Sequence, residues 1–98
     1  MDLIFEWDKN KANANLRKHN VSFDEAKTVF EDELLLTFSD DLNPAEENRF
    51  ISIGFSAYSR VLLVVHTEND ENNNAIVIRI ISCRRATKSE REVYEKGK

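Results

Sequence analysis

Three arginines near the C-terminal end occupy positions that point most directly to chemistry. Arg79 lies inside the apolar, β-branched run Ile76–Cys83. A guanidinium is costly in such a strand, so Arg79 pairs with an acid, lies in solvent over apolar neighbours, or faces an anionic ligand. A planar guanidinium fork matches the oxygens of a phosphate. Arg84 and Arg85 stand where this strand ends before a helix, which suits a phosphate site but equally describes a solvated pair.

Few other groups could transfer protons or attack a substrate. His66 closes an apolar strand and His19 ends a helix, so a structural role competes with acid–base chemistry at both. Cys83, the only cysteine, fits an apolar filler better than a nucleophile, and it favours a reduced, cytoplasmic protein. We find no metal-ligand spacing, glycine-rich nucleotide loop or serine-nucleophile motif, so we expect neither metal nor cofactor.

The charge is unevenly distributed along the chain. A formal net charge of −4 over 98 residues argues against a bulk nucleic-acid binder. Basic residues nevertheless gather near both ends, around Lys11 and Lys18 and again after Arg79. If these two groups meet, the protein has one positive face on an acidic body. The acidic stretch 40–47 could contact a basic partner, although a solvated loop is its more ordinary role.

The elements that must position these side chains follow an α+β order. Helix starts are marked by Asp8, an N-cap, and by two capping boxes, Ser22 with Glu25 and Thr87–Glu90. Asn20 is a helix stop. We expect strands over 3–5, 34–38, 49–55, 60–67 and 75–83, and helices over 9–18, 23–31 and 88–96. Short links between the later strands predict an antiparallel meander in a single domain over 1–98.

Two further expectations follow from the apolar pattern. Alternation puts Arg79 on the same face of the last strand as Val77, Ile81 and Cys83, opposite Ile76, Ile78, Ile80 and Ser82. If the second set packs on helices, Arg79 lies on an open sheet surface. The longest apolar run, 61–65, is too short to cross a bilayer, and the N-terminus has no signal-peptide pattern.

Motifs along nearly the whole chain resemble the BrnT family of toxins. In the first half these are Phe5-Glu6-Trp7-Asp8, Lys11, Asn15, Lys18-His19, Val21-Ser22-Phe23, Glu25-Ala26 and Val29-Phe30. In the second half they are Glu47, Arg49, Ile53-Gly54, Arg60, Leu63-Val64-Val65, Arg79-Ile80-Ile81-Ser82, Arg84, Ala86-Thr87, Glu90-Arg91 and Tyr94. The family commonly has an arginine after the Thr67-Glu68 pair, where this chain has Asn69.

The resemblance implies a RelE-like fold, with a small antiparallel sheet, two N-terminal helices and one C-terminal helix. It implies a bacterial type II toxin, a ribonuclease that stops translation. Its partner would be a BrnA-like antitoxin, which binds the toxin in a hetero-oligomer and alone contacts DNA. Such ribonucleases use basic groups with an acid or base on the open sheet face. The alternative is a catalytically weak or inactive interaction module, which binds the antitoxin and modulates operon repression.

These residues combine into a mechanism for metal-independent RNA cleavage. Attack by the 2′-OH on the adjacent phosphate needs a proton acceptor, a proton donor and stabilisation of the phosphorane. Arg79 and Arg84 would neutralise the phosphorane, His66 or Glu68 would act as base, and His19 as acid. The RNA backbone would be held by a set of basic side chains. This set comprises Lys11, Lys18, Arg60, Arg85, Lys88 and Arg91.

Overall fold

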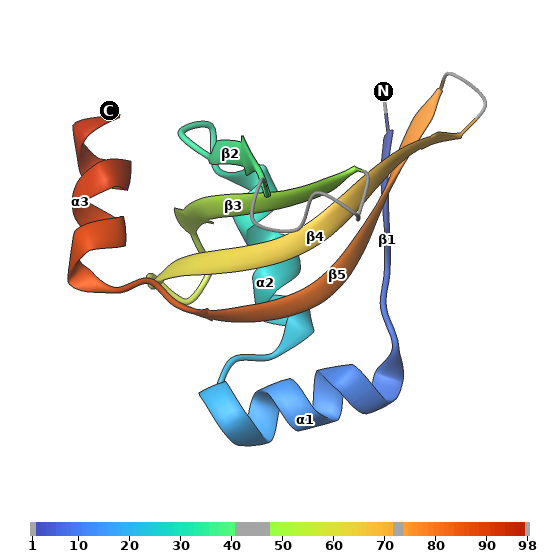
Figure 1. Ribbon diagram of the computed structural model, residues 1–98, viewed down its shortest axis with the longest axis horizontal. Helices are drawn as coiled ribbons and strands as arrows, with labels where there is room; N and C mark the ends of the chain where they lie inside the picture. The colour runs from blue at the N-terminus through green and yellow to red at the C-terminus, as the bar shows by residue number, and fades with distance from the viewer. Residues whose placement is uncertain (1, 41–47, 72–73, 98) are drawn as a thin grey trace.

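The computed structural model describes residues 2–40, 48–71 and 74–97, which form one five-stranded sheet with helices. The elements are β1 (Asp2–Glu6), α1 (Lys9–His19), α2 (Phe23–Thr28), the 3₁₀ turn η1 (Val29–Glu31), β2 (Leu36–Ser39), β3 (Arg49–Phe55), β4 (Val61–Glu71), β5 (Ala75–Arg85) and α3 (Lys88–Lys96). The strand order is β1-β5-β4-β3-β2, so β1 and β2 are the edges. Figure 1 shows β1 and α3 at opposite ends of the molecule.

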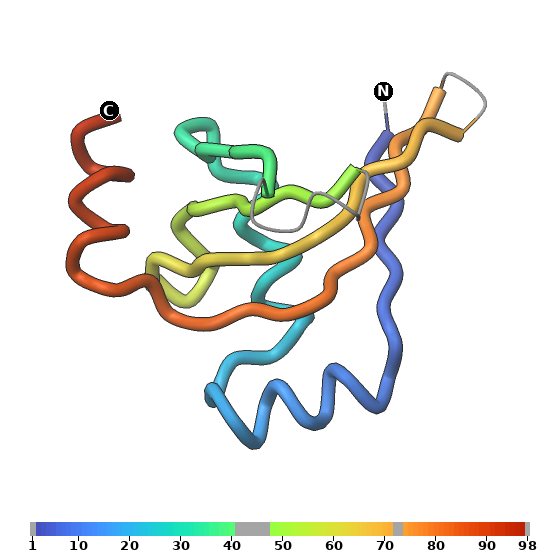
Figure 2. Tube along the Cα trace, viewed as in Figure 1, coloured from blue at the N-terminus to red at the C-terminus, as the bar shows by residue number. Residues whose placement is uncertain are grey.

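The sheet is mixed, which corrects the prediction of a purely antiparallel one. β2 to β5 form the expected antiparallel meander, but β1 pairs in parallel with β5. The first and last strands of the chain therefore lie side by side, as the trace in Figure 2 shows. Meander spacing identifies only pairs joined by short links, whereas β1 leads into a helix and pairs with the free edge of β5.

The ends of the helices follow the local signals, with one exception. Asp8 accepts hydrogen bonds from the backbone N–H groups of Asn10 (2.7 Å) and Lys11 (3.1 Å), and Asn20 ends α1 with φ of 57°. Thr87 and Glu90 form the complete capping box that begins α3. The box predicted at the start of α2 is only half formed.

At that start, Ser22 Oγ accepts from the backbone N–H of Glu25 at 3.0 Å, as expected. The Glu25 carboxylate does not return to the Ser22 backbone. It turns away to Arg60 and Ser56, which offer charge-assisted and hydroxyl hydrogen bonds in a buried position.

Strand lengths differ from the prediction in two places. β2 begins at Leu36, two residues late, because the side chain of Asp32 accepts from the Leu34 N–H and holds a turn there. β4 continues to Glu71, although the sequence predicted that this strand ends at residue 67. The acidic stretch predicted over 40–47 lies outside the described residues except for Asp40.

One face of the sheet carries the main core beneath α1 and α2. Its buried members are Val21, Phe23, Ala26, Val29, Leu62, Val64, Ile78, Ile80 and Cys83. Gly54 allows this packing, because a Cβ there would lie 2.7 Å from Leu35 Cδ1 and 3.1 Å from Val29 Cβ.

A β-bulge in β5 changes which residues share the second face. His66 pairs with Ile80 and Val65 with Ser82, so Ile81 is the extra residue. Alternation therefore fails after Ile81, and Cys83 joins the core instead of the face of Arg79. The same shift puts Arg84 on the face of Arg79. In the pairing of β4 with β5, Arg84 is the partner of Leu63 and Arg79 is the partner of Thr67.

Among residues 2–40, 48–71 and 74–97, α3 covers one end of this second face. Tyr94 of α3 packs there with Ile53 and Leu63. Beyond α3 none of the described helices covers this face, and it is called the open face below. No helix in the described part of the chain is long and apolar enough to cross a membrane.

Candidate functional site

The open face presents Arg79 to solvent beside a carboxylate. Because β1 runs parallel to β5, Glu6 lies directly across from Arg79, and Arg79 Nη1 donates to Glu6 Oε2 at 2.9 Å. The two side chains are 44% and 50% exposed. Arg79 thus has an acidic partner and still reaches solvent. Its other N–H groups make no hydrogen bond within the described part of the chain, so they are available to an anion.

The start of α1 adds charge beside this pair. The pKa of Asp8 lies below its ordinary value, chiefly because the backbone N–H groups of Lys11 and Asn10 bond its carboxylate. The positive charges of Lys11 and Arg79 lower it further. Lys11, predicted to hold RNA, is therefore within electrostatic reach of the same carboxylate as Arg79. The sheet and the N-terminus of α1 thus place a cation each within reach of Asp8.

Arg84 shares the open face but is fixed to α3. Its Nη1 and Nη2 donate to the two carboxylate oxygens of Glu90 at 2.8 and 2.9 Å. This fork lowers the pKa of Glu90 to about 2, and the same carboxylate accepts from the Thr87 backbone N–H. Arg84 therefore positions α3 on the sheet, and its side chain remains 39% exposed at the rim of the open face.

Arg49 is a third guanidinium on this face. It lies opposite Thr67 in the register, and its Nε is 3.1 Å from Asp40 Oδ2. Between these arginines lies an apolar floor of half-buried side chains, including Ile51 and Val65. The open face therefore combines guanidinium groups, carboxylates and a low-polarity surface, which together suit a charged, partly apolar ligand.

His66 does not join Arg79, because it belongs to the helix-covered face. Its side chain is fully buried against Phe30 and Phe50, and its Nε2 lies 2.7 Å from Ser52 Oγ. Burial lowers the pKa of His66 to about 4. A neutral imidazole sealed in the core cannot reach RNA, which corrects its predicted place at the site.

The other two proton-transfer candidates are also away from Arg79. Glu68 pairs with Ile78 and so lies on the side of His66, where burial raises its pKa. His19 is the last residue of α1, next to Lys18, at the far end of that helix from Lys11. The structure therefore does not assemble the predicted base and acid around Arg79.

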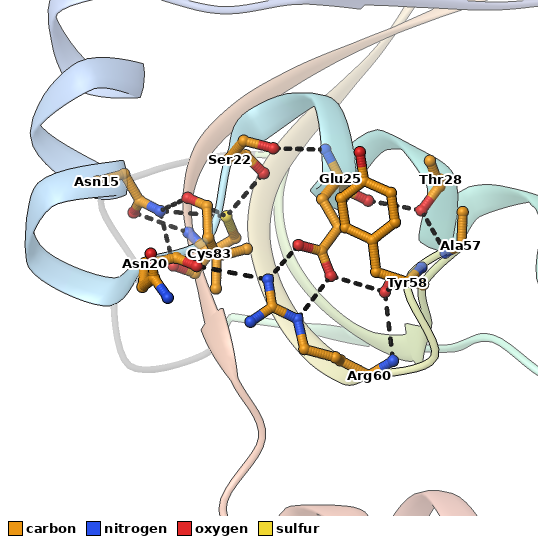
Figure 3. Close-up of polar contacts among 11 residues, drawn as sticks. Asn15, Asn20, Ser22, Glu25, Thr28, Ala57, Tyr58, Arg60 and Cys83 are labelled. Atoms are coloured by element: carbon orange, nitrogen blue, oxygen red, sulfur yellow. Dashed lines mark hydrogen bonds and ion pairs between the residues drawn. The ribbon is translucent and has the colours of Figure 1, made fainter.

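Arg60, predicted to contact RNA, forms an ion pair with a fully buried carboxylate. Its Nε donates to Glu25 Oε2 at 2.9 Å and its Nη2 contacts Glu25 Oε1, while Ser56 Oγ donates to Oε2 at 2.7 Å (Figure 3). Burial alone would raise the pKa of Glu25, but the bonds from Arg60 and Ser56 outweigh it and leave the pKa lowered. This pair ties α2 to the β3–β4 turn.

A second buried contact in Figure 3 joins α1 to β5. Asn15 Nδ2 donates to the backbone oxygens of Cys83 (2.9 Å) and Val21 (3.0 Å), and Asn15 Oδ1 accepts from the Cys83 N–H. Burial raises the pKa of Cys83 to about 12, so the thiol stays protonated. Cys83 is the filler that the sequence predicted.

Three of the predicted RNA-binding arginines line one hollow at the end of the sheet near α3. Its volume is about 370 Å³, and Arg60, Arg85 and Arg91 contribute to its wall. Lys88 is exposed at the start of α3 and Lys18 on α1, and neither lines this hollow. The cations of the open face and the arginines of the hollow are therefore two separate groups, and Lys18 and Lys88 lie outside the hollow.

Two carboxylates that pair with arginines, Glu6 and Glu25, were missed in the sequence. Glu6 gains its place only through the parallel pairing of β1 with β5. Glu25 is the buried member of its pair, and its capping-box position in the sequence offered a simpler role for its carboxylate. Among the described residues, no three His, Cys, Asp or Glu side chains group as a metal site.

Comparisons with known proteins place the chain beside one family. Residues 7–90 match the family model described as the ribonuclease toxin BrnT of type II toxin–antitoxin systems. The crystal structure of the Brucella abortus ribonuclease toxin BrnT superposes with a TM-score of 0.64 at 19% identity, covering 90% of this chain and 100% of that one. No curated protein sequence matches. The likeness confirms an α+β fold, while the RelE-like relationship stays a prediction.

Proposed function

This chain belongs to the BrnT family of ribonuclease toxins of type II toxin–antitoxin systems, and we propose that it is a metal-independent endoribonuclease that cuts RNA on its open face. The proposal places the protein in the bacterial cytoplasm, where RNA cleavage would inhibit translation. The observation that carries it is the solvent-exposed Glu6–Arg79 pair, since it sets a carboxylate beside a guanidinium that has unused N–H groups.

Glu6 and Arg79 supply complementary parts of a 2′-OH attack. The Glu6 carboxylate accepts the proton of the 2′-OH, whose oxygen then bonds to the adjacent phosphorus. The bond from that phosphorus to the 5′-oxygen breaks, and the leaving oxygen takes a proton from solvent water, which gives a 2′,3′-cyclic phosphate and a 5′-hydroxyl end. Arg79 donates to the nonbridging oxygens, where charge grows in the phosphorane, an effect of about 3 kcal/mol for one well-placed donor. In this proposal Glu6 takes the role for which the sequence suggested His66 or Glu68.

Neighbouring cations hold the RNA for this reaction. Lys11, which like Arg79 lies within electrostatic reach of Asp8, attracts the phosphate backbone, while Arg84 and Arg49 present positive charge from the rim. Contacts of this kind add affinity and salt sensitivity but little sequence preference. Glu90 already occupies the fork of Arg84, so Arg84 acts through its field rather than through direct bonds to the phosphorane.

The proposed partner is a BrnA-like antitoxin that neutralises the toxin in a hetero-oligomer and alone contacts DNA. Family membership supports an antitoxin partner. Ile4 and Phe38, each 46% exposed, lie on edge strands of the open face and offer apolar contacts to a bound protein. An antitoxin that covers this face would block Glu6 and Arg79 together.

Induced expression and RNA analysis test the catalytic assignment. Arg79→Ala should abolish growth inhibition and cleavage of RNA in a buffer with a metal chelator, while antitoxin binding persists. Glu6→Gln should give the same loss, because the amide cannot accept the proton. Arg17→Ala removes an exposed cation of α1 outside this face and is the matched control. Undiminished toxicity of Arg79→Ala at equal expression would contradict the role of Arg79.

Asn69 favours a second candidate, an interaction module that binds the antitoxin without efficient cleavage. The register puts Asn69 two residues beyond Thr67 on the same side of β4, where the family commonly has an arginine. Asn69 instead accepts a hydrogen bond from Asn48 at 3.1 Å. We expect Asn69→Arg to raise RNA cleavage if the native chain is weak. Absence of cleavage in both proteins, with tight antitoxin binding, would favour the module.

A further inference from the structure

The hollow lined by Arg60, Arg85 and Arg91 is not used in the proposed cleavage reaction. It lies where β5 ends and α3 begins, at the opposite end of the molecule from β1 (Figure 1). Arg85 is six residues from Arg79 along β5, a distance of about 20 Å for an extended strand. The hollow, called the arginine hollow below, is therefore a separate place from the Glu6–Arg79 pair.

Arg60 gives the arginine hollow a fixed guanidinium. Glu25, whose side chain is only 1% exposed, holds it through both carboxylate oxygens, and Arg60 Nη2 also lies 3.4 Å from the Asn20 backbone oxygen. Because the side chain is already ordered, a ligand would not have to immobilise it on binding. Glu25 neutralises this charge, so the unbalanced charge must come from the other residues of the wall.

Arg85 and Arg91 supply that charge from two different elements. Arg85 ends β5, and its positive charge contributes to the lowered pKa of Glu25, which shows that it lies within electrostatic reach of the ion pair. Arg91 projects from the first turns of α3, and Glu95, one turn further on, is the carboxylate in the wall. Two arginines against one glutamate leave the hollow positive although the whole chain is acidic.

An exposed aromatic ring completes the wall. Phe55, at the end of β3, lines the hollow and is 46% exposed, and Tyr58 in the adjoining turn is 70% exposed. Guanidinium groups beside an aromatic face suit a nucleotide, because the phosphate and the base can each find a partner. An acidic peptide would use the arginines but not the ring, so the composition favours nucleic acid.

We propose that the arginine hollow binds a phosphate of single-stranded RNA, with the adjoining base stacked on Phe55. This inference rests on the proposed function, and it assigns the hollow to a stretch of the substrate several nucleotides away from the cut. Arg85 and Arg91 bind the phosphate directly, and Arg60 is the fixed part of the site. The hollow then selects RNA strands long enough to reach both places.

The test uses a labelled 2′-O-methyl RNA of a dozen nucleotides, which the mechanism above cannot cleave. Arg85→Ala/Arg91→Ala should weaken its binding by about tenfold or more, since each lost bond is charge-assisted. The slope of log affinity against log salt should fall by roughly 0.7 for each arginine removed. Glu95→Gln should instead strengthen binding, because it removes the negative charge of the carboxylate in the wall.

Arg17→Ala/Lys96→Ala makes the same change in net charge elsewhere on the surface and should leave binding near that of the native protein. Phe55→Leu should weaken binding without changing the salt slope. On cleavable RNA, Arg85→Ala/Arg91→Ala should raise KM for the long strand, leave kcat nearly unchanged, and not affect a dinucleotide substrate.

Different outcomes separate the two proposals. If the protein cuts RNA, and Arg85→Ala/Arg91→Ala binds and cuts RNA as the native chain does, the RNA site in the hollow is overturned while the proposed cleavage reaction is supported. The inference also falls if the double variant loses only antitoxin affinity, since the hollow would then bind protein. If no RNA is cut but the oligonucleotide binds with the expected variant pattern, the hollow stands and the cleavage reaction is overturned.

Discussion

Two arginine–glutamate pairs join the same residue types in opposite surroundings. Arg60 and Glu25 lie on the helix-covered side, with side chains 22% and 1% exposed, while Arg79 and Glu6 lie on the open face at 44% and 50%. Ser56 and the Asn20 backbone oxygen make further hydrogen bonds to the first pair, whereas a single hydrogen bond joins Arg79 to Glu6. Burial, rather than residue type, thus separates a structural pair from a pair available to a ligand.

The two pairs differ in the free energy that is lost when one partner is removed. A buried pair that loses one partner leaves the other charge desolvated and uncompensated, whereas exposed ion pairs contribute little because water and salt screen them. The exposed pair can therefore be changed without unfolding the protein, and a substrate can compete with Glu6 for Arg79 at small cost.

The largest effect is expected at the buried pair. Glu25→Ala leaves Arg60 and Ser56 without their acceptor, and we expect a loss of about 3 kcal/mol or more of unfolding free energy. Urea denaturation followed by circular dichroism measures it. Asp24→Ala removes a neighbouring, exposed carboxylate of α2 and serves as the control. Equal losses for the two variants would contradict the comparison.

A pH effect of similar size is expected from His66 on the same side. Its pKa is about 4 in the folded protein against an ordinary value of 6.5, so the unfolded chain binds the proton first as pH falls. The contribution of His66 to the free energy of unfolding is fully present above pH 6.5, and it falls by up to about 3 kcal/mol as the pH is lowered towards 4. Glu68, with its raised pKa, acts in the opposite direction.

Denaturation of the native chain and of His66→Gln across this pH range isolates the histidine, because Glu68 remains in both proteins. The native chain should lose stability more steeply with acid. Parallel curves would show that His66 is not the titrating group.

A smaller loss is expected at the rim of the open face. Glu90→Ala removes the fork from Arg84 and the bond from the Thr87 N–H, and we expect about 1 to 2 kcal/mol from the lost cap and ion pair. Hydrogen exchange should show faster opening of α3 with little change in α1. Uniform acceleration across the chain would mean that Arg84 and Glu90 support more than this helix.

The smallest stability effect belongs to the exposed pair. Arg79→Ala should change the unfolding free energy by less than about 1 kcal/mol, because both side chains are well solvated. The same variant is expected to lose cleavage, so activity and stability separate at this residue. A thermal melt next to the cleavage assay checks both, and a large drop in melting temperature would make Arg79 structural.

Local chemistry was readable in the sequence, and long-range pairing was not. The Asn20 helix stop, the Thr87–Glu90 capping box and the strand Arg49–Phe55 were predicted because neighbouring residues determine them. Arg79 was correctly placed on an open face, since alternation holds up to the bulge at Ile81. Cys83 was placed on the wrong face, since a bulge adds one residue without a local signal.

The same limit explains the candidate site. The sequence identified the arginines that could bind a ligand. It did not identify the carboxylates that pair with them, because Glu6 and Glu25 come from elements distant in the chain. His66 closes an apolar strand in the sequence, and only the packing of Phe30 and Phe50 shows that it is sealed from solvent. Burial depends on elements that meet in space, which neither spacing nor composition reveals.

The parallel pairing of β1 with β5 also determines when the open face can exist. Glu6 and Arg79 are 73 residues apart in a chain of 98, so they meet only when most of it has been made. Contacts this distant close late in folding because their loop entropy must be overcome first. On the ribosome, Glu6 therefore waits without Arg79 until β5 has been made and has joined β1.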